Sequence, residues 1–265
     1  MMRETGFAID RYGWKPTFIE ESMPAKDSEA LAGLIRKLDR LSKLDAEDQE
    51  MLAALPFRLE SVPAGTLLVR EGALVTQCCM LAQGYACRHK TSAEGKRQIV
   101  SFHLAGDILD IQHLVLARAD HNVETITSVE VAWIAADQLR TLAVERPNIG
   151  QALWRDALID ASVFREWVLN VGRRDARTRI AHMLCEFGAR ALATGVARGE
   201  HFLLPLTQEQ IADATGLTAV HVNRMLRYLR EAGALSVGQK GVRIEDFGLL
   251  RAISSFDASY LHAAA

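Results

Sequence analysis

Two short amphipathic helices separated by one glycine are encoded in residues 206–230, and this pattern constrains the fold more than any other stretch of the chain. Thr207 is suited to cap the first helix, and Thr218 is suited to cap the second, soon after Gly216. A small residue, Ala212, and the turn glycine allow the two helices to cross closely. Apolar residues of the second helix recur at helical spacing, at Val222, Met225, Leu226 and Leu229. Together these features predict a helix-turn-helix.

The opposite face of the second helix is basic. Three arginines and no acidic residue lie between residues 219 and 230, as a helix that faces phosphates and base edges requires. Strand-like runs at residues 235–237 and 242–244, with Lys240 at the turn between them, predict a wing. The candidate DNA-contacting residues are Thr207, Gln208 and Thr218 for phosphates, His221, Asn223 and Arg224 for base edges, and also Arg227 and Lys240. A small helical domain with an ordinary solvated face is the alternative interpretation.

The chain changes its periodicity between residues 57 and 146. Glycines recur there every 7 to 12 residues, at Gly65, Gly72, Gly84, Gly95 and Gly106. Strand-like runs fill the intervals and continue beyond them, at residues 67–70, 77–82, 85–89, 98–104, 123–127 and 129–134. Glycine accepts the positive φ of tight turns, so this regular spacing predicts an antiparallel sandwich or jelly roll. The expected fold class is therefore α+β.

Two helical segments flank this region, and a third follows them. Ser28 is a candidate cap for a helix with apolar residues at Leu31, Leu34, Ile35, Leu38 and Leu41. Pro147 opens a long helix with an apolar seam at Leu153, Ala157, Ala161, Phe164, Val168 and Val171. This near-heptad spacing predicts a dimer of parallel helices, and packing against the sandwich is the alternative. Gly172 is expected to end the helix, and Asp175 to cap the next one, which carries Ile180, Met183, Leu184 and Phe187.

Composition and charge indicate a two-part soluble chain. It has 265 residues, of which 49% are hydrophobic and 24% charged, so wholesale disorder is excluded. The formal net charge is −2, yet residues 173–265 hold 12 Lys+Arg against 9 Asp+Glu, which favours this part as the partner of a polyanion. No apolar run approaches the ~18 residues of a membrane helix, and the start lacks a signal-peptide pattern. We therefore expect a cytoplasmic protein that makes no membrane contact.

The chain resembles the Crp/Fnr superfamily of bacterial transcription regulators over residues 28–250. The resemblance lies in residues 63–72, in Gly106-Asp107, in residues 175–181 and in residues 206–230. It implies a jelly roll like the cyclic-nucleotide-binding domain, a dimerisation helix and a winged helix-turn-helix. The implied parts are a tail (1–27), a sensor domain (28–146), the helix (147–172) and a DNA-binding domain (173–265). It also implies a homodimer on pseudo-palindromic promoter DNA, contact with RNA polymerase (for which residues 194–201 are a candidate) and a sensed signal.

The sensor domain departs from the cyclic-AMP-binding pattern. A gap-free alignment on Gly106-Asp107 places Ile111 where the family has a ribose-binding glutamate, and His121 and Asn122 where it has a phosphate-clamping Arg-Ser pair. An isoleucine cannot accept a hydrogen bond, and the bidentate guanidinium contact is lost. We therefore predict no physiological response to cyclic AMP. The candidate pocket for another effector comprises Asp107, Asp110, Ile111, His121, Asn122, Phe164 and Arg165, and a collapsed pocket in a protein controlled by its abundance is the alternative.

Other chemistries are weakly supported. Cys78, Cys79 and Cys87 are candidates for a redox switch, although such cysteines are commonly small core residues, and they lack the N-terminal spacing of an iron–sulfur cluster. Four histidines in the sensor half keep haem open, but no cofactor is predicted. No H-x-H, G-x-S-x-G, P-loop or H-E-x-x-H motif occurs, so we expect a non-enzyme. A module that binds DNA without sequence preference, or binds only a partner protein, is the remaining alternative.

Overall fold

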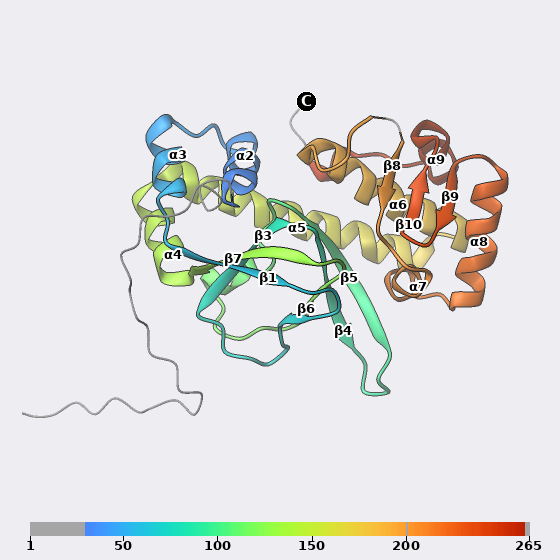
Figure 1. Ribbon diagram of the computed structural model, residues 1–265, viewed down its shortest axis with the longest axis horizontal. Helices are drawn as coiled ribbons and strands as arrows, with labels where there is room; N and C mark the ends of the chain where they lie inside the picture. Colours follow the sequence, from blue (N-terminus) through green and yellow to red (C-terminus); the bar gives the residue numbers. More distant parts are fainter. Residues whose placement is uncertain (1–29, 200, 263–265) are drawn as a thin grey trace, which may run out of the picture.

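The computed structural model describes residues 30–199 and 201–262, in which a β-sandwich and a smaller helical domain are joined by one long helix (Figure 1). The sandwich lies under the first half of the long helix, and the second domain lies at its far end. Ser28, the expected cap of the first helix, and the expected tail over residues 1–27 lie outside the described residues. Among the described helices, none is long and apolar enough to cross a membrane.

The predicted antiparallel sandwich is confirmed. One sheet has the order β1-β7-β3, and the other has the order β2-β6-β4-β5. The strands are β1 (Phe57–Val62), β2 (Leu67–Val69), β3 (Gln77–Gln83), β4 (Tyr85–Thr91), β5 (Arg97–Leu104), β6 (Asn122–Thr125) and β7 (Val129–Ala135). Gly84 turns the chain between β3 and β4 with φ +91°, and a Cβ there would lie 2.6 Å from the Ser128 carbonyl oxygen. Only glycine fits this turn without backbone movement.

Helices cover one end of the sandwich and form a second apolar core with it. The helices are α2 (Ala32–Leu41), α3 (Ala46–Ala53) and α4 (Ala136–Glu145), and a short 3₁₀ helix, η1 (Ile111–Leu114), follows β5. Leu34 and Leu38 of α2 are fully buried, as the helical spacing predicted. The sequence patterns did not predict α3 or α4. Helix α3 begins with a capping box between Asp45 and Asp48, and α4 continues directly from β7.

The long helix is α5 (Pro147–Arg173), and it begins at Pro147 as predicted. Two expectations about α5 are wrong. The helix does not end at Gly172 but continues through Arg173, and Arg174 leaves it with extended backbone. Leu153 does not belong to an exposed seam, because it is 3% exposed and packs in the core beneath α2 and α4.

The C-terminal domain is a winged helix-turn-helix. Its elements are α6 (Ala176–Thr194), β8 (Phe202–Leu204), α7 (Gln208–Thr215), α8 (Ala219–Glu231), β9 (Leu235–Gly238), β10 (Gly241–Ile244), α9 (Phe247–Ser254) and the 3₁₀ turn η2 (Ser259–Leu261). Asp175 caps α6 by accepting from the backbone N–H groups of Arg177 and Thr178, as predicted. The predicted hairpin is the β9–β10 pair, which β8 extends to three strands in the order β8-β10-β9.

The two domains share one apolar core. Phe102 of β5 stacks on Phe187 of α6 with ring centroids 5.1 Å apart, and Trp167 of α5 meets the edge of Phe102 at 5.7 Å. Polar contacts continue the interface at α7, where Arg97 Nε lies 2.7 Å from Asp213 Oδ2. The helix-turn-helix is thus seated directly on the sandwich strand β5.

Candidate nucleic-acid interface and interdomain cavity

Threonine residues cap the N-termini of both helices of the helix-turn-helix, α7 and α8. Thr207 Oγ1 accepts from the Gln210 N–H at 3.1 Å, and the Gln210 side chain accepts from the Thr207 N–H at 2.9 Å. Thr218 Oγ1 accepts from the His221 N–H at 3.3 Å. Each hydroxyl still has its own hydrogen to donate, because it serves only as an acceptor in its cap. Both threonines therefore remain able to donate to a phosphate.

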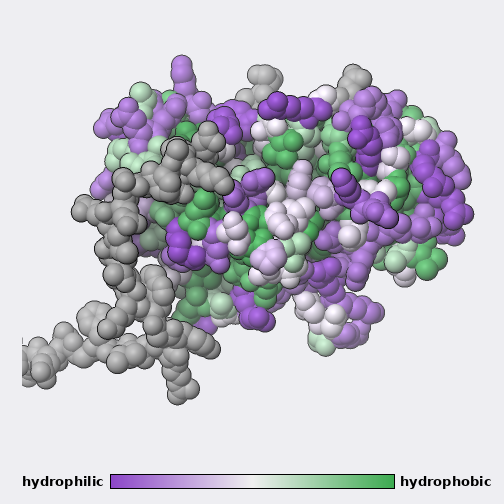
Figure 2. Space-filling model, viewed as in Figure 1, coloured by the Kyte–Doolittle hydropathy of each residue, from purple (hydrophilic) through white to green (hydrophobic). Residues whose placement is uncertain are grey.

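The outer face of α8 is exposed and basic. Val222 and Leu229 are buried on the inner face, whereas Asn223, Arg224 and Arg227 are exposed. Hydrophilic residues cover most of the edge of the molecule at which α8 lies (Figure 2). The remaining candidates are not all alike in exposure: Lys240 is exposed between β9 and β10, while His221 and Gln208 are half-buried.

One pair of the candidate residues is in direct contact. Asn223 Nδ2 donates to Gln208 Oε1 over 3.1 Å, so the first residue of α7 touches the outer face of α8. Two arginines that the sequence reasoning missed support the same unit from α6. Arg179 Nη1 donates to the Thr215 carbonyl oxygen at 2.8 Å, and the Arg177 guanidinium lies 4.8 Å from the ring centroid of Tyr228. Their signal in the sequence was their position in the first turn after the Asp175 cap.

A cavity of about 440 Å³ lies between the sandwich, α2, α5 and α6. Its apolar wall includes Leu41, Leu104, Ile108, Ile159, Val163 and Leu261. Its polar lining comprises Lys37, Arg40, Arg88, His103, Asp107, Asp156, Asp160, Arg190 and Thr194. A largely apolar wall with a few convergent polar groups is typical of small-molecule sites.

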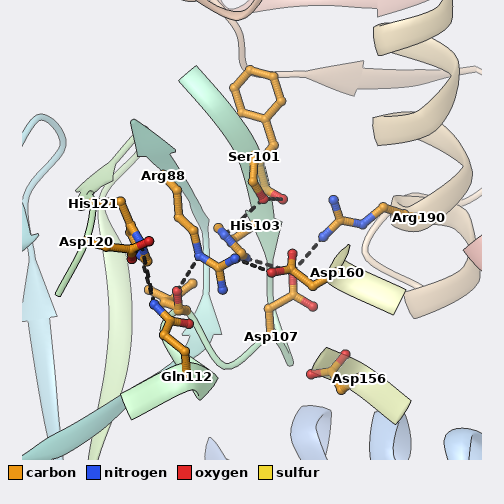
Figure 3. Close-up of polar contacts among 12 residues, drawn as sticks. Arg88, Ser101, His103, Asp107, Gln112, Asp120, His121, Asp156, Asp160 and Arg190 are labelled. Atoms are coloured by element: carbon orange, nitrogen blue, oxygen red, sulfur yellow. Dashed lines mark hydrogen bonds and ion pairs between the residues drawn. The ribbon is translucent and has the colours of Figure 1, made fainter. Parts of the chain in front are cut away.

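Asp107 is the centre of the polar lining. Figure 3 shows it together with His103 of β5, Asp160 of α5 and Arg190 of α6. Its carboxylate lies 2.8 Å from Lys37 Nζ of α2 and 3.0 Å from Arg190 Nη2 of α6. The Leu104 N–H donates to it at 3.0 Å. Burial alone would raise the pKa of Asp107, but Lys37, His103 and Arg190 hold this pKa well below its usual range. Asp107 therefore links α2, the sandwich and the C-terminal domain as a charged group.

A second ion pair crosses the cavity wall from β4 to α5. Arg88 Nη1 pairs with Asp160 Oδ2, and Arg88 Nε donates to the Leu109 carbonyl oxygen at 2.7 Å. Beside this pair, His103 Nε2 lies 3.1 Å from Ser101 Oγ. Burial, reinforced by the positive charge of Arg88, lowers the pKa of His103 to about 4, so its imidazole is neutral near pH 7.

The structure brings only part of the predicted effector pocket together. Asp107 and Ile111 line the cavity. Asp110 is buried beneath it and accepts from the Cys79 N–H at 3.0 Å, while His121 pairs with Asp120 at 2.7 Å. His121 and Asp120 lie on the other side of Arg88 from Asp107 (Figure 3). Asn122 lies outside the lining, and its Oδ1 accepts from the Glu71 N–H at 3.0 Å.

Phe164 and Arg165 are exposed and do not line the cavity. The residues of α5 that line it are Asp156, Ile159, Asp160 and Val163, which repeat every three or four residues. One face of a helix is shared by such residues, so positions 164 and 165 point elsewhere. In the single chain, Phe164 and Arg165 therefore lie on another face of α5 than the residues that line this cavity.

The exposed face of α5 is strongly apolar. Trp154 is 72% exposed, Leu158 61%, Phe164 52% and Val168 60%, and Leu169 is exposed beside them. The predicted seam included Phe164 and Val168 but not Trp154, Leu158 or Leu169. It started at buried Leu153, whereas the exposed apolar face starts at the next residue, Trp154. Contiguous exposed apolar side chains of this size mark an interaction surface.

The cysteines of the sandwich are buried thiols. Cys78, Cys79 and Cys87 are each at most 2% exposed. Burial raises the pKa of Cys78 and of Cys87 to about 12, and raises that of Cys79 well above its usual value. A thiol reacts as its thiolate, so these environments disfavour redox chemistry. Within residues 30–199 and 201–262, no group of three or more His, Cys, Asp or Glu side chains is arranged to hold a metal ion.

Comparisons with known proteins cover both domains. Residues 59–146 match the sequence model of the cyclic nucleotide-binding domain, and residues 178–253 match that of the Crp-like helix-turn-helix domain. The transcriptional activator protein FnrL of Cereibacter sphaeroides is 27% identical over 213 residues, which is 79% of this chain and 85% of FnrL. The nitrogen fixation regulation protein FixK of Bradyrhizobium diazoefficiens is 27% identical over 214 residues, with 81% of this chain and 89% of FixK covered.

Solved structures share the same fold. FixK2 from Bradyrhizobium japonicum superimposes with a TM-score of 0.69 at 23% identity, over 77% of this chain and all (100%) of that chain. The c-di-GMP-responsive regulator CLP of Xanthomonas campestris gives a TM-score of 0.60 at 18% identity, over 76% of this chain and 99% of that chain. The sandwich, the long helix and the winged helix-turn-helix thus occur in the same order as in these regulators, and the chain belongs to the Crp/Fnr family of transcription regulators.

Proposed function

We propose that this protein is a sequence-specific transcription regulator that binds a pseudo-palindromic promoter site as a homodimer. The observation that carries the proposal is the outer face of α8, which is exposed, basic and held on a rigid, doubly capped framework. Two such helices related by a two-fold axis would enter successive major grooves of the duplex. A population shift of the long helices would then set the spacing and the angle of the two reading heads.

The residues on this face divide into two roles. Asn223 and Arg224 are exposed and carry the bidentate groups that match adenine and guanine edges, with His221 beside them. Thr207, Gln208 and Thr218 surround the two helix N-termini, where backbone N–H groups and dipoles favour phosphate. Arg227 and Lys240 add positive charge for the flanking backbone. Val220, which is 82% exposed, cannot accept a hydrogen bond from cytosine, so the half-site should differ from those of relatives with glutamate there.

The proposal is tested by selecting binding sites from random duplex DNA with the purified protein. A two-fold symmetric motif with half-sites about one helical turn apart is expected. Asn223→Ala and Arg224→Ala should each weaken binding to that motif by about 1–3 kcal/mol and relax the preference at one base pair. Arg36→Ala, an exposed arginine of α2, is the matched control and should leave both unchanged. Equal weakening on all sequences would assign the two residues to phosphates only.

We propose that the exposed apolar face of α5 is the homodimer interface. Trp154 and Val168 lie 14 residues apart, which is two heptads, and Phe164 lies four residues before Val168, as in the seam of two parallel helices that bury each other; Leu158 flanks this row. Contact with RNA polymerase is proposed separately, for the segment that follows α6, in which Arg198 and His201 are exposed.

The sensor input is proposed to act at the interdomain cavity and not through cyclic AMP. Ile111 offers no acceptor for a ribose hydroxyl, and Arg88 is already engaged by Asp160 and the Leu109 carbonyl. A small molecule is the favoured signal over a redox change, because the thiols are buried. Calorimetric titration should show no saturable micromolar binding of cyclic AMP. Such binding, lost in an Arg88→Ala variant, would overturn this assignment.

A further inference from the structure

Gln208 and Asn223 form a contact that phosphate binding alone does not require. Gln208 is the first residue of α7, and its backbone is held by the capping box between Thr207 and Gln210. Its Oε1 accepts from Asn223 Nδ2 at 3.1 Å, although the two residues are 15 positions apart in the sequence. The acceptor therefore belongs to a residue at the start of one helix, and the amide that it holds belongs to the other helix. Because a phosphate can only accept, a Gln208 amide that turns Nε2 toward the DNA backbone keeps Oε1 for Asn223.

The hydrogen bond orients the Asn223 amide. A side-chain amide carries two N–H groups and one oxygen, and its terminal torsion is broad and roughly two-fold. Gln208 Oε1 takes one N–H, which places the nitrogen on the α7 side. The second N–H and Oδ1 remain free, and together they form one donor and one acceptor.

This remaining pair matches adenine and not guanine. In the major groove adenine presents the N7 acceptor beside the N6 donor, whereas guanine presents two acceptors, N7 and O6. A freely rotating amide reverses the order of its donor and acceptor, and an amide held from one side does not. Gln208 keeps its own Nε2 hydrogens, so it can hold a phosphate and the Asn223 amide together.

We propose that Gln208 is a positioning residue for base reading, which holds the Asn223 amide in the orientation that selects adenine over guanine at one base pair of each half-site. The inference rests on the proposed function, because it assumes that α8 reads bases. It adds a specificity role to a residue whose other role is to contact the DNA backbone.

Two substitutions of Gln208 test its role as an acceptor for Asn223 separately from its contact with the DNA phosphates. Gln208→Glu keeps an acceptor for Asn223 and adds a negative charge near the phosphates. Gln208→Lys keeps a donor for phosphate and removes the acceptor. Each variant is measured on the selected duplex and on the same duplex with the Asn223-dependent adenine replaced by guanine. Circular dichroism and thermal unfolding confirm that both variants are folded.

The readout is the ratio of the two affinities. Gln208→Glu should keep the adenine-over-guanine ratio while binding to both duplexes weakens. Gln208→Lys should lower that ratio about tenfold, toward the value of Asn223→Ala, while binding to the guanine duplex is retained. Adding Gln208→Lys to Asn223→Ala should produce no further loss of the ratio, because the amide that Gln208 orients is already gone.

Each contrary result has its own meaning. An unchanged ratio in Gln208→Lys, with a lowered ratio in Asn223→Ala, would limit Gln208 to the phosphate contact and overturn the inference. An unchanged ratio in Asn223→Ala would overturn it as well, since there would be no amide reading to orient. The first result leaves the proposed function intact, and the second removes only Asn223 from its base-reading residues. Sequence-specific binding itself fails separately, if the selection enriches no sequence at all.

Discussion

His103 illustrates how a single buried residue can make stability depend on pH. It lies 3% exposed beside Arg88 and Asp107, and burial lowers its pKa from 6.5 to about 4. The unfolded chain therefore binds a proton between these two values, while the folded protein does not. Stability from His103 is complete above about pH 6.5 and is lost as the pH falls toward 4.

The prediction at this scale compares wild-type protein with His103→Gln. Between pH 7 and pH 5, wild-type protein should lose about 2 kcal/mol more unfolding free energy than the variant, because the variant has no imidazole to protonate at position 103. Urea denaturation at the two pH values measures the difference. His262→Gln changes an exposed histidine and should follow wild-type protein. Parallel losses in wild-type protein and His103→Gln would show that His103 does not contribute.

At the scale of the element, α5 has three faces, and each lies in a different environment. Ile149 and Leu153 pack in the core of the sensor domain, and Asp156 and Asp160 face the cavity. The apolar face that includes Val168 is exposed. An α-helix completes one turn every 3.6 residues, so residues that are neighbours in the sequence can lie on different faces. The residues that face the cavity and the residues of the exposed apolar face therefore belong to the same helix.

Val168→Glu should dissociate the dimer. In the proposed interface the two-fold axis would bury two carboxylates against apolar side chains, so dimerisation should weaken by at least on the order of a hundredfold. Val144→Glu is the matched control, since Val144 is 79% exposed on α4 and does not belong to the exposed apolar face of α5. Sedimentation over a range of concentrations distinguishes the two. Equal dimerisation of Val168→Glu and wild-type protein would place the interface elsewhere.

At the scale of the whole molecule, the sandwich domain and the winged helix-turn-helix domain are joined by charge as well as by the aromatic core. Asp107 of the sandwich pairs with Arg190 of α6, and Arg97 of β5 pairs with Asp213 of α7. Asp107 also pairs with Lys37 of α2 at the cavity wall. Any molecule that rearranges this wall therefore acts directly on α6, the first helix of the DNA-binding domain.

Arg190→Ala should destabilise the folded protein by about 1.5–3 kcal/mol or more, because it removes the charged hydrogen bond to Asp107 and the 3.8 Å ion pair with buried Glu186, while Asp107 keeps Lys37 and the Leu104 N–H. Urea unfolding followed by tryptophan fluorescence measures the loss. Trp167, one of four tryptophans, lies at the domain interface, where its Nε1 donates to Glu186 at 2.9 Å, so the total fluorescence includes a probe in the affected region. Arg198→Ala, which removes an exposed arginine, should have no such effect. Equal stability of the two variants would show that the Asp107–Arg190 ion pair does not stabilise the interface between the two domains.

Local patterns predicted most elements and few of the relations between them. Thr207, Gly216 and Asp175 act on their own helix ends, so their roles were visible in the sequence. Helix α4 was missed because it follows β7 without a glycine or proline break. The sequence did not show that Asp156 and Asp160, rather than Phe164 and Arg165, are the residues of α5 that line the cavity in the single chain, because the rotation of a helix is set by its packing.

The sequence by itself determined the antiparallel sandwich, the long helix and the helix-turn-helix, since turns, caps and apolar periodicity depend on neighbouring residues. Only the tertiary structure decided which polar residues meet. Lys37, Asp107 and Arg190 come from three distant elements, and Gln208 reaches Asn223 across a turn. Such contacts depend on how helices pack and rotate against one another, and that packing is set by the whole core.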